Sequence, residues 1–239
     1  MSKIFVTGDT HGLIDIYHIL PDSFTQANEL TRDDYLIVAG DCGVLFYPDM
    51  ADNQKVLKIV SELPYTLLWV DGNHENFDLI EQYPVTPWKG GLIQKIGENC
   101  FHLTRGSYYD LDGTTIFAFG GGISIDRKWR REHVSWWPQE LPNSTEYNLG
   151  LDNLKKHQNK VDCIITHAAP LSVMKGIFGG DGFSFEDGRG EIPLDTYLEE
   201  LKNSIDYKHW YLGHLHKDDE ETFKEERITL LYQQIKQIK

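Results

Sequence analysis

Residues 35–41, YLIVAGD, place an apolar run directly before a glycine and an aspartate. The run is nearly continuous rather than alternating, as is typical of a strand covered on both faces. Similar runs that stop at a glycine or polar cluster recur at Ile4–Val6, Thr66–Val70, Thr115–Phe119, Val161–Ile165 and Trp210–Leu212. We therefore predict a layered α/β architecture whose strands are buried on both faces.

Helical patterns separate most of these strands. The predicted helices cover residues 13–28, 49–63, 144–158 and 193–205, with Asn143 and Glu146 as a capping box and Pro193 in a first turn. The pair Asp112–Gly113 lies between two strand-like runs and predicts a hairpin, so the sheet system should be mixed. No repeat, low-complexity tract or long linker interrupts the chain, and we predict a single domain over residues 1–239.

Composition and charge limit the classes of function. No apolar run is long enough to span a bilayer, and the start MSKIFVTGD leaves no room for a signal peptide, so we expect a soluble, cytoplasmic protein. The three widely spaced cysteines suggest neither a disulfide framework nor a zinc–thiolate site, and Cys42 is expected to be a buried filler. A net charge of −14 opposes adsorption to nucleic acid or to an anionic membrane, although bound cations could create a local positive site.

Potential metal ligands follow five of the six predicted strands. They are Asp9 and His11, Asp41, Asn73, His167, and then His214 and His216. Ligands of open α/β sheets bind outside the carboxyl ends of the strands, so these side chains should converge. A set of carboxylates, imidazoles and one amide without thiolate favours Mn, Fe, Zn, Co or Ni over Ca or an all-oxygen Mg site.

Such a ligand set suits hydrolysis at phosphorus. An aspartate can bridge two cations, and paired cations about 3.5–4 Å apart stabilise the attacking and leaving oxygens of an in-line displacement. This chemistry needs no serine or cysteine nucleophile, and the sequence contains no GxSxG, GxxxxGK[ST] or GxGxxG motif. The GGG run at 120–122 indicates only a tight turn.

Five short motifs carry these residues: GDTH at 8–11, GDCG at 40–43, GNHE at 72–75, THAAP at 166–170 and GHLH at 213–216. Their order resembles the pattern of the calcineurin-like metallophosphoesterase superfamily. The resemblance implies an α/β fold, a four-layer αββα sandwich with two mixed β-sheets and a metal site at the carboxyl ends of the strands. It also implies a metal-dependent phosphoesterase that uses in-line attack by a metal-bridged hydroxide.

The resemblance assigns roles by motif. Asp9, His11 and His216 are expected to hold one divalent cation, Asn73, His167 and His214 the other, and Asp41 to bridge the two and act in catalysis. Manganese is the metal expected to support activity in vitro. His74 is the expected catalytic residue, which stabilises developing charge or protonates the leaving oxygen, with Glu75 orienting it.

The substrate is less constrained. The sequence GDCGVLF lacks the Asp-Arg-Gly continuation of the Ser/Thr protein phosphatase branch, which disfavours that activity. We expect a small phosphodiester or nucleotide-type substrate. A nuclease, a phosphomonoesterase or protein phosphatase, and a catalytically silent scaffold of the same fold are the alternatives.

Two further segments are candidates for contact with substrate. In Asp126–Trp137, Arg127 and Arg130 are candidate phosphate contacts, or the segment is a solvated basic loop whose tryptophans pack on the core. The glycine-rich stretch 176–192 is expected to be a surface loop, with a lid as the alternative. The other five histidines are expected to be structural or surface residues: His18, His102, His133, His157 and His209.

Overall fold

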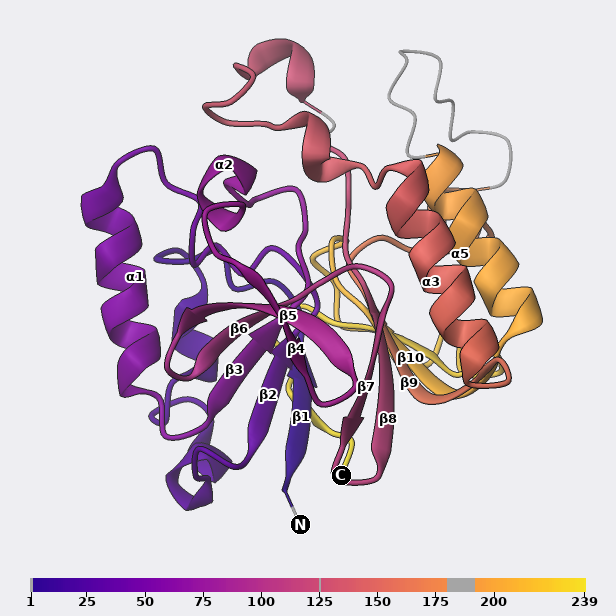
Figure 1. Cartoon of the computed structure of the whole chain (residues 1–239), viewed down its shortest axis with the longest axis horizontal. Helices are drawn as coiled ribbons and strands as arrows, with labels where there is room; N and C mark the ends of the chain where they lie inside the picture. The colour runs from indigo at the N-terminus through magenta and orange to yellow at the C-terminus, as the bar shows by residue number, and fades with distance from the viewer. Residues whose placement is uncertain (1, 125, 180–191) are drawn as a thin grey trace.

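Two β-sheets form the centre of the computed structural model, which describes residues 2–124, 126–179 and 192–239 (Figure 1). Within these residues, one sheet has seven strands in the order β12-β1-β2-β3-β6-β5-β4 and the other five in the order β11-β10-β9-β8-β7. The strands of the first sheet are β1 (Ile4–Thr7), β2 (Tyr35–Val38), β3 (Thr66–Trp69), β4 (Val85–Trp88), β5 (Gly91–Gly97), β6 (Cys100–Leu103) and β12 (Lys236–Gln237). Those of the second are β7 (Ser107–Leu111), β8 (Thr114–Phe119), β9 (Lys160–Thr166), β10 (Asp206–Leu212) and β11 (Ile228–Leu230).

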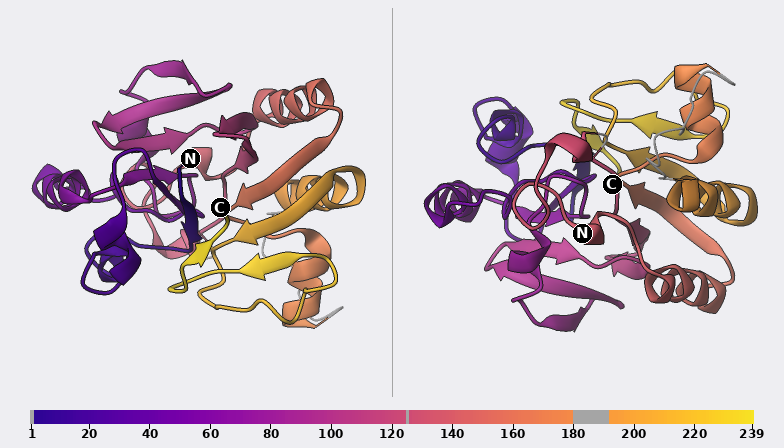
Figure 2. Two further views of the ribbon diagram at one scale, coloured as in Figure 1. Left: turned by 90° about the horizontal axis from the view of Figure 1, so that it is seen from below. Right: turned by 90° about the horizontal axis from the view of Figure 1, so that it is seen from above.

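Both sheets are mixed, as predicted. Strands β1, β2, β3 and β6 run parallel, whereas β12, β5 and β4 add antiparallel edges. In the second sheet, β8 to β11 run parallel and β7 is antiparallel to β8. The β7–β8 connection is the expected hairpin, with positive φ at Asp112 and Gly113, as its tight turn requires. Figure 2 shows the two chain ends near one another, where β12 pairs with β1.

Apolar side chains fill three layers. Ile4 and Val6 of β1 point between the sheets, where they share a core with Ile165 of β9, whereas Phe5 points to the opposite face. That outer face packs against α1 (Met50–Glu62), through Val56 among others. The outer face of the second sheet packs against α3 (Ser144–Lys156), α4 (Leu171–Phe178) and α5 (Ile192–Ser204). The predicted four-layer αββα sandwich is thereby confirmed, and helices flank both sheets in Figure 1.

Three predicted helices are confirmed within a few residues, and Asn143 and Glu146 form the capping box at the start of α3. The helix predicted over 13–28 is wrong: that stretch holds two short 3-10 helices, η1 (Ile16–Ile19) and η2 (Thr25–Glu29). Pro21 lies between them, and it can neither donate a helical hydrogen bond nor tolerate a helical residue before it. The apolar pattern there reflects burial of loop side chains.

Several short elements were missed, because two- to seven-residue strands and a single helical turn carry too few residues for a period to show. They are β4, β5, β6, β11, β12 and α2 (Phe77–Ile80), together with the longer α4. Of the predicted loop at 176–192, residues 176–178 belong to α4, and 180–191 lie outside the described residues. No helix in the part of the chain described here is long and apolar enough to cross a membrane.

Candidate metal centre

The carboxyl ends of strands from both sheets meet at one place. Here the described residues include two groups whose potential ligand atoms lie within 4.8 Å of one another. The first group is Asp9, His11, Asp41 and His216, and the second is Asp41, His167 and His214. Asp41 belongs to both groups, so the two are contiguous.

The first group combines two carboxylates with two imidazoles. Nε2 of His216 lies 3.1 Å from Oδ2 of Asp9, and Nε2 of His11 lies 3.5 Å from Oδ2 of Asp41. Asp9 and Asp41 are almost completely buried, whereas the His216 side chain is 51% exposed. The two carboxylates of the group are therefore buried, and the group is exposed to solvent on the side of His216.

The second group lies on the other side of Asp41. Nε2 of His167 is 3.3 Å from Oδ1 of Asp41 and 3.2 Å from Oδ1 of Asn73. The rings of His167 and His214 lie 4.6 Å apart between centroids. The structure thus brings together all seven residues that the sequence singled out as metal ligands.

A divalent cation fits these residues. Oδ2 of Asp9 is buried, and no described group donates a hydrogen bond to it, although Nε2 of His216 is near. Nδ1 of His11 lies 2.8 Å from Oδ2 of Asp15, and Nδ1 of His167 lies 2.9 Å from the carbonyl oxygen of Ala39. When these Nδ1 atoms donate, the Nε2 lone pairs face the carboxylates, an arrangement that a cation between them stabilises.

The charges at the site act strongly on one another. Burial lowers the pKa of His11, but the carboxylates of Asp41, Asp9 and Asp15 outweigh it and raise that pKa to about 9. Burial likewise opposes ionisation of Asp41, yet the imidazoles of His167, His11 and His74 hold the pKa of Asp41 well below its usual range. The pocket therefore favours positive charge.

The backbone is bent to bring the ligands inward. His11, Asp41, His214 and His216 have φ between 42° and 68°, a left-handed conformation that is unfavourable for residues with a Cβ. Hydrogen bonds to the ligands themselves hold two of the turns: the amide of His74 donates to Oδ1 of Asp41 at 2.8 Å, and that of His214 to Oδ1 of Asp9 at 3.0 Å. The two carboxylates thus help to hold the turns in this unfavourable conformation.

Glycine is required where the loops touch. Gly40 has a φ of 90°, and a Cβ there would overlap the ring of His167. A Cβ at Gly72 would overlap Oδ1 of Asp41, and it would lie 2.6 Å from the amide nitrogen of Asp41. The glycines of GDCG and GNHE therefore allow the two loops to pack directly on the ligands.

His74 lies beside the first group. Its ring centroid is 5.2 Å from that of His11 and 5.1 Å from that of Phe46. Burial lowers the pKa of His74, which the charge of Asp41 opposes and that of Arg130 reinforces. Nη2 of Arg130 lies 3.5 Å from Nε2 of His74, so this candidate substrate contact is within the site.

One expectation from the sequence, the role of Glu75, is corrected. Glu75 does not orient His74: its buried carboxylate accepts the amides of Cys42 and Gly43, at 2.8 and 3.3 Å, and so holds the GDCG loop. Burial, with the nearby Asp41 charge, raises the pKa of Glu75.

Arg127 contacts Glu140, with Nη2 3.2 Å from Oε2, and it also contacts the face of Trp136. The expected burial of Cys42 is confirmed.

Sequence reasoning missed the residues that support the ligands. Oδ2 of Asp15 lies 2.8 Å from Nδ1 of His11 and accepts the hydroxyl of Tyr232 at 3.2 Å, while the Tyr232 ring stacks on His216. The four-residue spacing of His11 and Asp15 is a weak signal for this pair. Nothing in the sequence near Tyr232 indicates its role, because it follows the last motif and returns to the site only through the fold.

A buried charge network lies behind the GNHE loop. The carboxylate of Asp71 contacts the guanidinium of Arg105 and Nε2 of His102, and Arg105 also reaches the Glu146 carboxylate at 3.3 Å. Oδ2 of Asp71 is 2.8 Å from Nε of Arg105. His102 is thus structural, as expected, and the network ties the end of β3 to β6 and α3.

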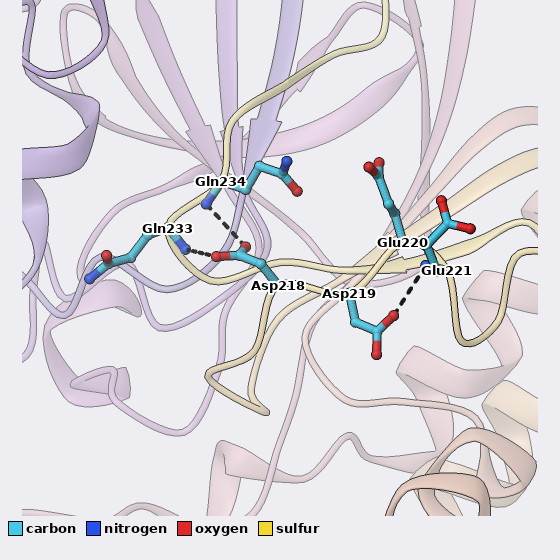
Figure 3. A pocket seen from close by; sticks show the side chains of 6 residues that line it. All are labelled: Asp218, Asp219, Glu220, Glu221, Gln233 and Gln234. Atoms are coloured by element: carbon cyan, nitrogen blue, oxygen red, sulfur yellow. Dashed lines mark hydrogen bonds between the residues drawn. The ribbon is translucent and has the colours of Figure 1, made fainter.

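A second concave surface, lined by Asp218, Asp219, Glu220, Glu221, Gln233 and Gln234, lies outside the metal groups (Figure 3). Asp218 accepts the backbone amides of Tyr232, Gln233 and Gln234. Asp219 likewise accepts the amides of Glu221 and Thr222. These acids shape the turn that carries Tyr232, and we assign no ligand to them.

Comparison with known proteins bears directly on this geometry. A family profile described as calcineurin-like phosphoesterase matches residues 2–218. The chain belongs to the calcineurin-like phosphoesterase family. This family is metal-dependent, and its match spans all five motifs and all seven candidate ligands of the chain.

Two curated relatives in this family share low identity with the chain. The lariat debranching enzyme of Schizosaccharomyces pombe is 23% identical over 236 residues, and that of Drosophila pseudoobscura pseudoobscura is 24% identical over 244 residues. Each match covers 90% of this chain but only 48% and 42% of the respective relative, so the chain spans about half the length of the curated relatives it matches. These calcineurin-like phosphoesterases are not Ser/Thr protein phosphatases, in agreement with the missing Asp-Arg-Gly.

Proposed function

We propose that this calcineurin-like phosphoesterase hydrolyses phosphodiester bonds with two divalent cations, one in each ligand group. The observation that carries the proposal is the position of Asp41, which belongs to both groups and lies between His11 and His167. A carboxylate shared in this way suits a bridge between paired cations. When bound, the cations supply charge neutralisation at phosphorus and activation of water.

The chain's own residues supply the remaining parts of the mechanism. Asp15 and the carbonyl of Ala39 fix the rings of His11 and His167, and Glu75 holds the GDCG loop that carries Asp41. His74 lies beside the cation sites without being one of their ligands, where its N–H can stabilise or protonate the leaving oxygen. The guanidinium of Arg130 is close enough to His74 to contact a non-bridging oxygen of the same phosphate.

The choice of a diester rests on the relatives. Their name assigns them the debranching of lariats, and we transfer from it only the class of bond, a phosphodiester. Manganese is the metal we propose for activity in vitro.

The test compares two chromogenic substrates. Protein stripped of metal and reloaded with Mn²⁺ is expected to hydrolyse bis(4-nitrophenyl) phosphate faster than 4-nitrophenyl phosphate, and Asp41→Asn is expected to abolish both reactions. Faster hydrolysis of the monoester would assign the site to phosphomonoesters. No turnover by protein shown to contain two ions would favour the silent scaffold.

A further inference from the structure

The segment 126–131 presents the most exposed large apolar side chain of the described residues. Trp129 is 82% exposed, whereas the neighbouring Trp137 is fully buried. Arg130 follows Trp129 directly in the chain and reaches His74. An exposed indole therefore lies one residue away from a side chain that contacts the candidate catalytic histidine.

The base of this segment is well anchored. Nε1 of Trp137 donates to Asp78 at 2.8 Å, and Nη1 of Arg130 donates to the carbonyl of Ser135 at 3.0 Å. Nε of Arg130 pairs with Asp126 at 2.6 Å, and Arg127 lies between Glu140 and Trp136. Hydrogen bonds and ion pairs thus hold the segment, and Trp129 remains exposed although Trp137 is fully buried and the Trp136 ring contacts Arg127.

The charges around Trp129 indicate the class of ligand that its indole ring contacts. Residues 126–131 contain four cationic side chains and one acid, in a chain of net charge −14. Arg127 and Arg130 are paired with acids, whereas Lys128 and Arg131 form no ion pair with any described residue. Nζ of Lys128 lies 5.5 Å from the Trp129 ring centroid. An exposed aromatic ring with cationic residues beside it in the chain suits single-stranded nucleic acid, because the ring can stack on a base and the cations can neutralise adjacent phosphates.

We propose that Trp129 stacks on an unpaired base of a single-stranded nucleic acid whose phosphates contact Lys128 and Arg131. The strand then continues past Arg130, and an adjacent phosphodiester reaches His74 and the ligand groups. Stacking needs an unpaired base, and the acidic charge of the rest of the chain disfavours a long duplex contact. This inference rests on the proposed function, since it names the substrate class of the same site.

Binding is measured apart from turnover. A short fluorescein-labelled oligothymidylate with phosphorothioate linkages, which resists hydrolysis, is titrated with the Mn²⁺-loaded protein and followed by fluorescence anisotropy. Trp129→Ala is expected to raise the Kd by roughly 5- to 150-fold, the range that corresponds to one base–aromatic stack. Trp129→Phe is expected to retain most of the affinity. Tyr17→Ala, which removes another exposed ring on a different element, is expected to leave the Kd unchanged.

The basic residues are tested by salt. For the double variant Lys128→Gln, Arg131→Gln, the plot of log affinity against log salt concentration is expected to be less steep by about 1.4, or about 0.7 for each phosphate contact. An unchanged slope overturns the assignment of these residues to phosphates.

Kinetics separates the two proposals. Trp129→Ala is expected to raise KM for an unmodified single-stranded oligonucleotide and to leave hydrolysis of bis(4-nitrophenyl) phosphate within twofold of the wild type. An unchanged Kd for the oligonucleotide, a parallel loss with both substrates, or tighter binding of an acidic peptide overturns the inference. If the small diester is not cleaved at all, the proposed function fails, while the anisotropy measurement still decides whether Trp129 binds a strand.

Discussion

His74 is tied to the candidate metal centre by a backbone hydrogen bond. Its amide donates to Asp41, and its imidazole faces His11, Phe46 and Arg130. Its neighbour Glu75, adjacent in sequence, points instead to the GDCG loop. Two consecutive residues of one motif therefore have different surroundings: His74 lies beside the candidate ligands, and Glu75 holds the GDCG loop.

His74→Ala is expected to lower kcat by about 10²- to 10⁴-fold, the usual contribution of a positioned acid or base. Metal content, measured by atomic absorption, is expected to stay near the wild-type value because the ring is not a proposed ligand. His157→Ala, which removes a ring stacked on Tyr108 away from the site, is the control. Loss of metal from the His74 variant would contradict the role given to this residue.

Asp15→Ala is expected to weaken Mn²⁺ binding by about 10- to 100-fold, because it removes the acceptor facing Nδ1 of His11 and the hydroxyl of Tyr232. Tyr232→Phe removes only one of these contacts, and a smaller loss is expected. Isothermal titration calorimetry of metal-free protein measures both. Asp22→Ala, an exposed carboxylate on the same stretch, should bind Mn²⁺ like the wild type, and equal weakening in this control would point to bulk charge instead.

The first two strands of the large sheet are joined by a carboxylate as well as by their ladder. Asp34 lies just before β2, and Lys3 lies just before β1. Oδ1 of Asp34 accepts a hydrogen bond from the amide of Lys3 at 2.7 Å, and Oδ2 accepts one from the amide of Thr31 at 2.8 Å. Burial opposes ionisation, but these hydrogen bonds outweigh it and hold the pKa of Asp34 below its usual range. The ionised form therefore stabilises the folded state above the unfolded pKa of about 3.9.

Asp34→Asn is expected to lower the free energy of unfolding by about 1–2 kcal/mol at neutral pH, because the amide nitrogen of Asn would face a backbone N–H. As pH falls through the low folded-state pKa of Asp34, the wild type loses this advantage. The free energies of unfolding of the wild type and of Asp34→Asn should then converge. Urea unfolding at several pH values measures the difference. Asp33→Asn, at the exposed neighbouring position, serves as the control, and a difference that persisted at low pH would refute the ionic contribution.

The candidate metal centre joins the two sheets. Asp9, Asp41 and Asn73 follow strands of the seven-stranded sheet, whereas His167 and His214 follow strands of the five-stranded sheet. Cations bound here would link layers that otherwise contact one another through apolar side chains. Metal binding should therefore affect the stability of the whole fold.

Mn²⁺ at about 100 times its dissociation constant is expected to stabilise the metal-free protein by about 2.7 kcal/mol for one site, and so to raise the Tm. Differential scanning calorimetry with and without EDTA measures the shift. Asp41→Asn, which alters the shared ligand, is expected to lose most of it. A Tm that does not respond to Mn²⁺ would contradict metal binding at this place.

The sequence alone determined the layered architecture and the seven candidate ligand positions. Strands such as Tyr35–Val38 are apolar on both faces because two cores enclose them, and each ligand follows directly at a strand end, so local pattern and chemistry coincide. Residues 13–28 show a helical pattern without forming one long helix, since burial in a loop and burial on a helix produce similar patterns.

Only the tertiary structure decided which side chains support the ligands. Asp15 and Tyr232 meet at His11 and His216 although 217 positions separate them, and Arg105 reaches Asp71 across 34. Glu75 turns to the GDCG loop and Arg130 to His74, directions that depend on how neighbouring loops pack. Local periodicity reports whether a residue is buried, but the partner of a buried or site-facing group is set by contacts between distant segments, which one sequence does not encode in any local pattern.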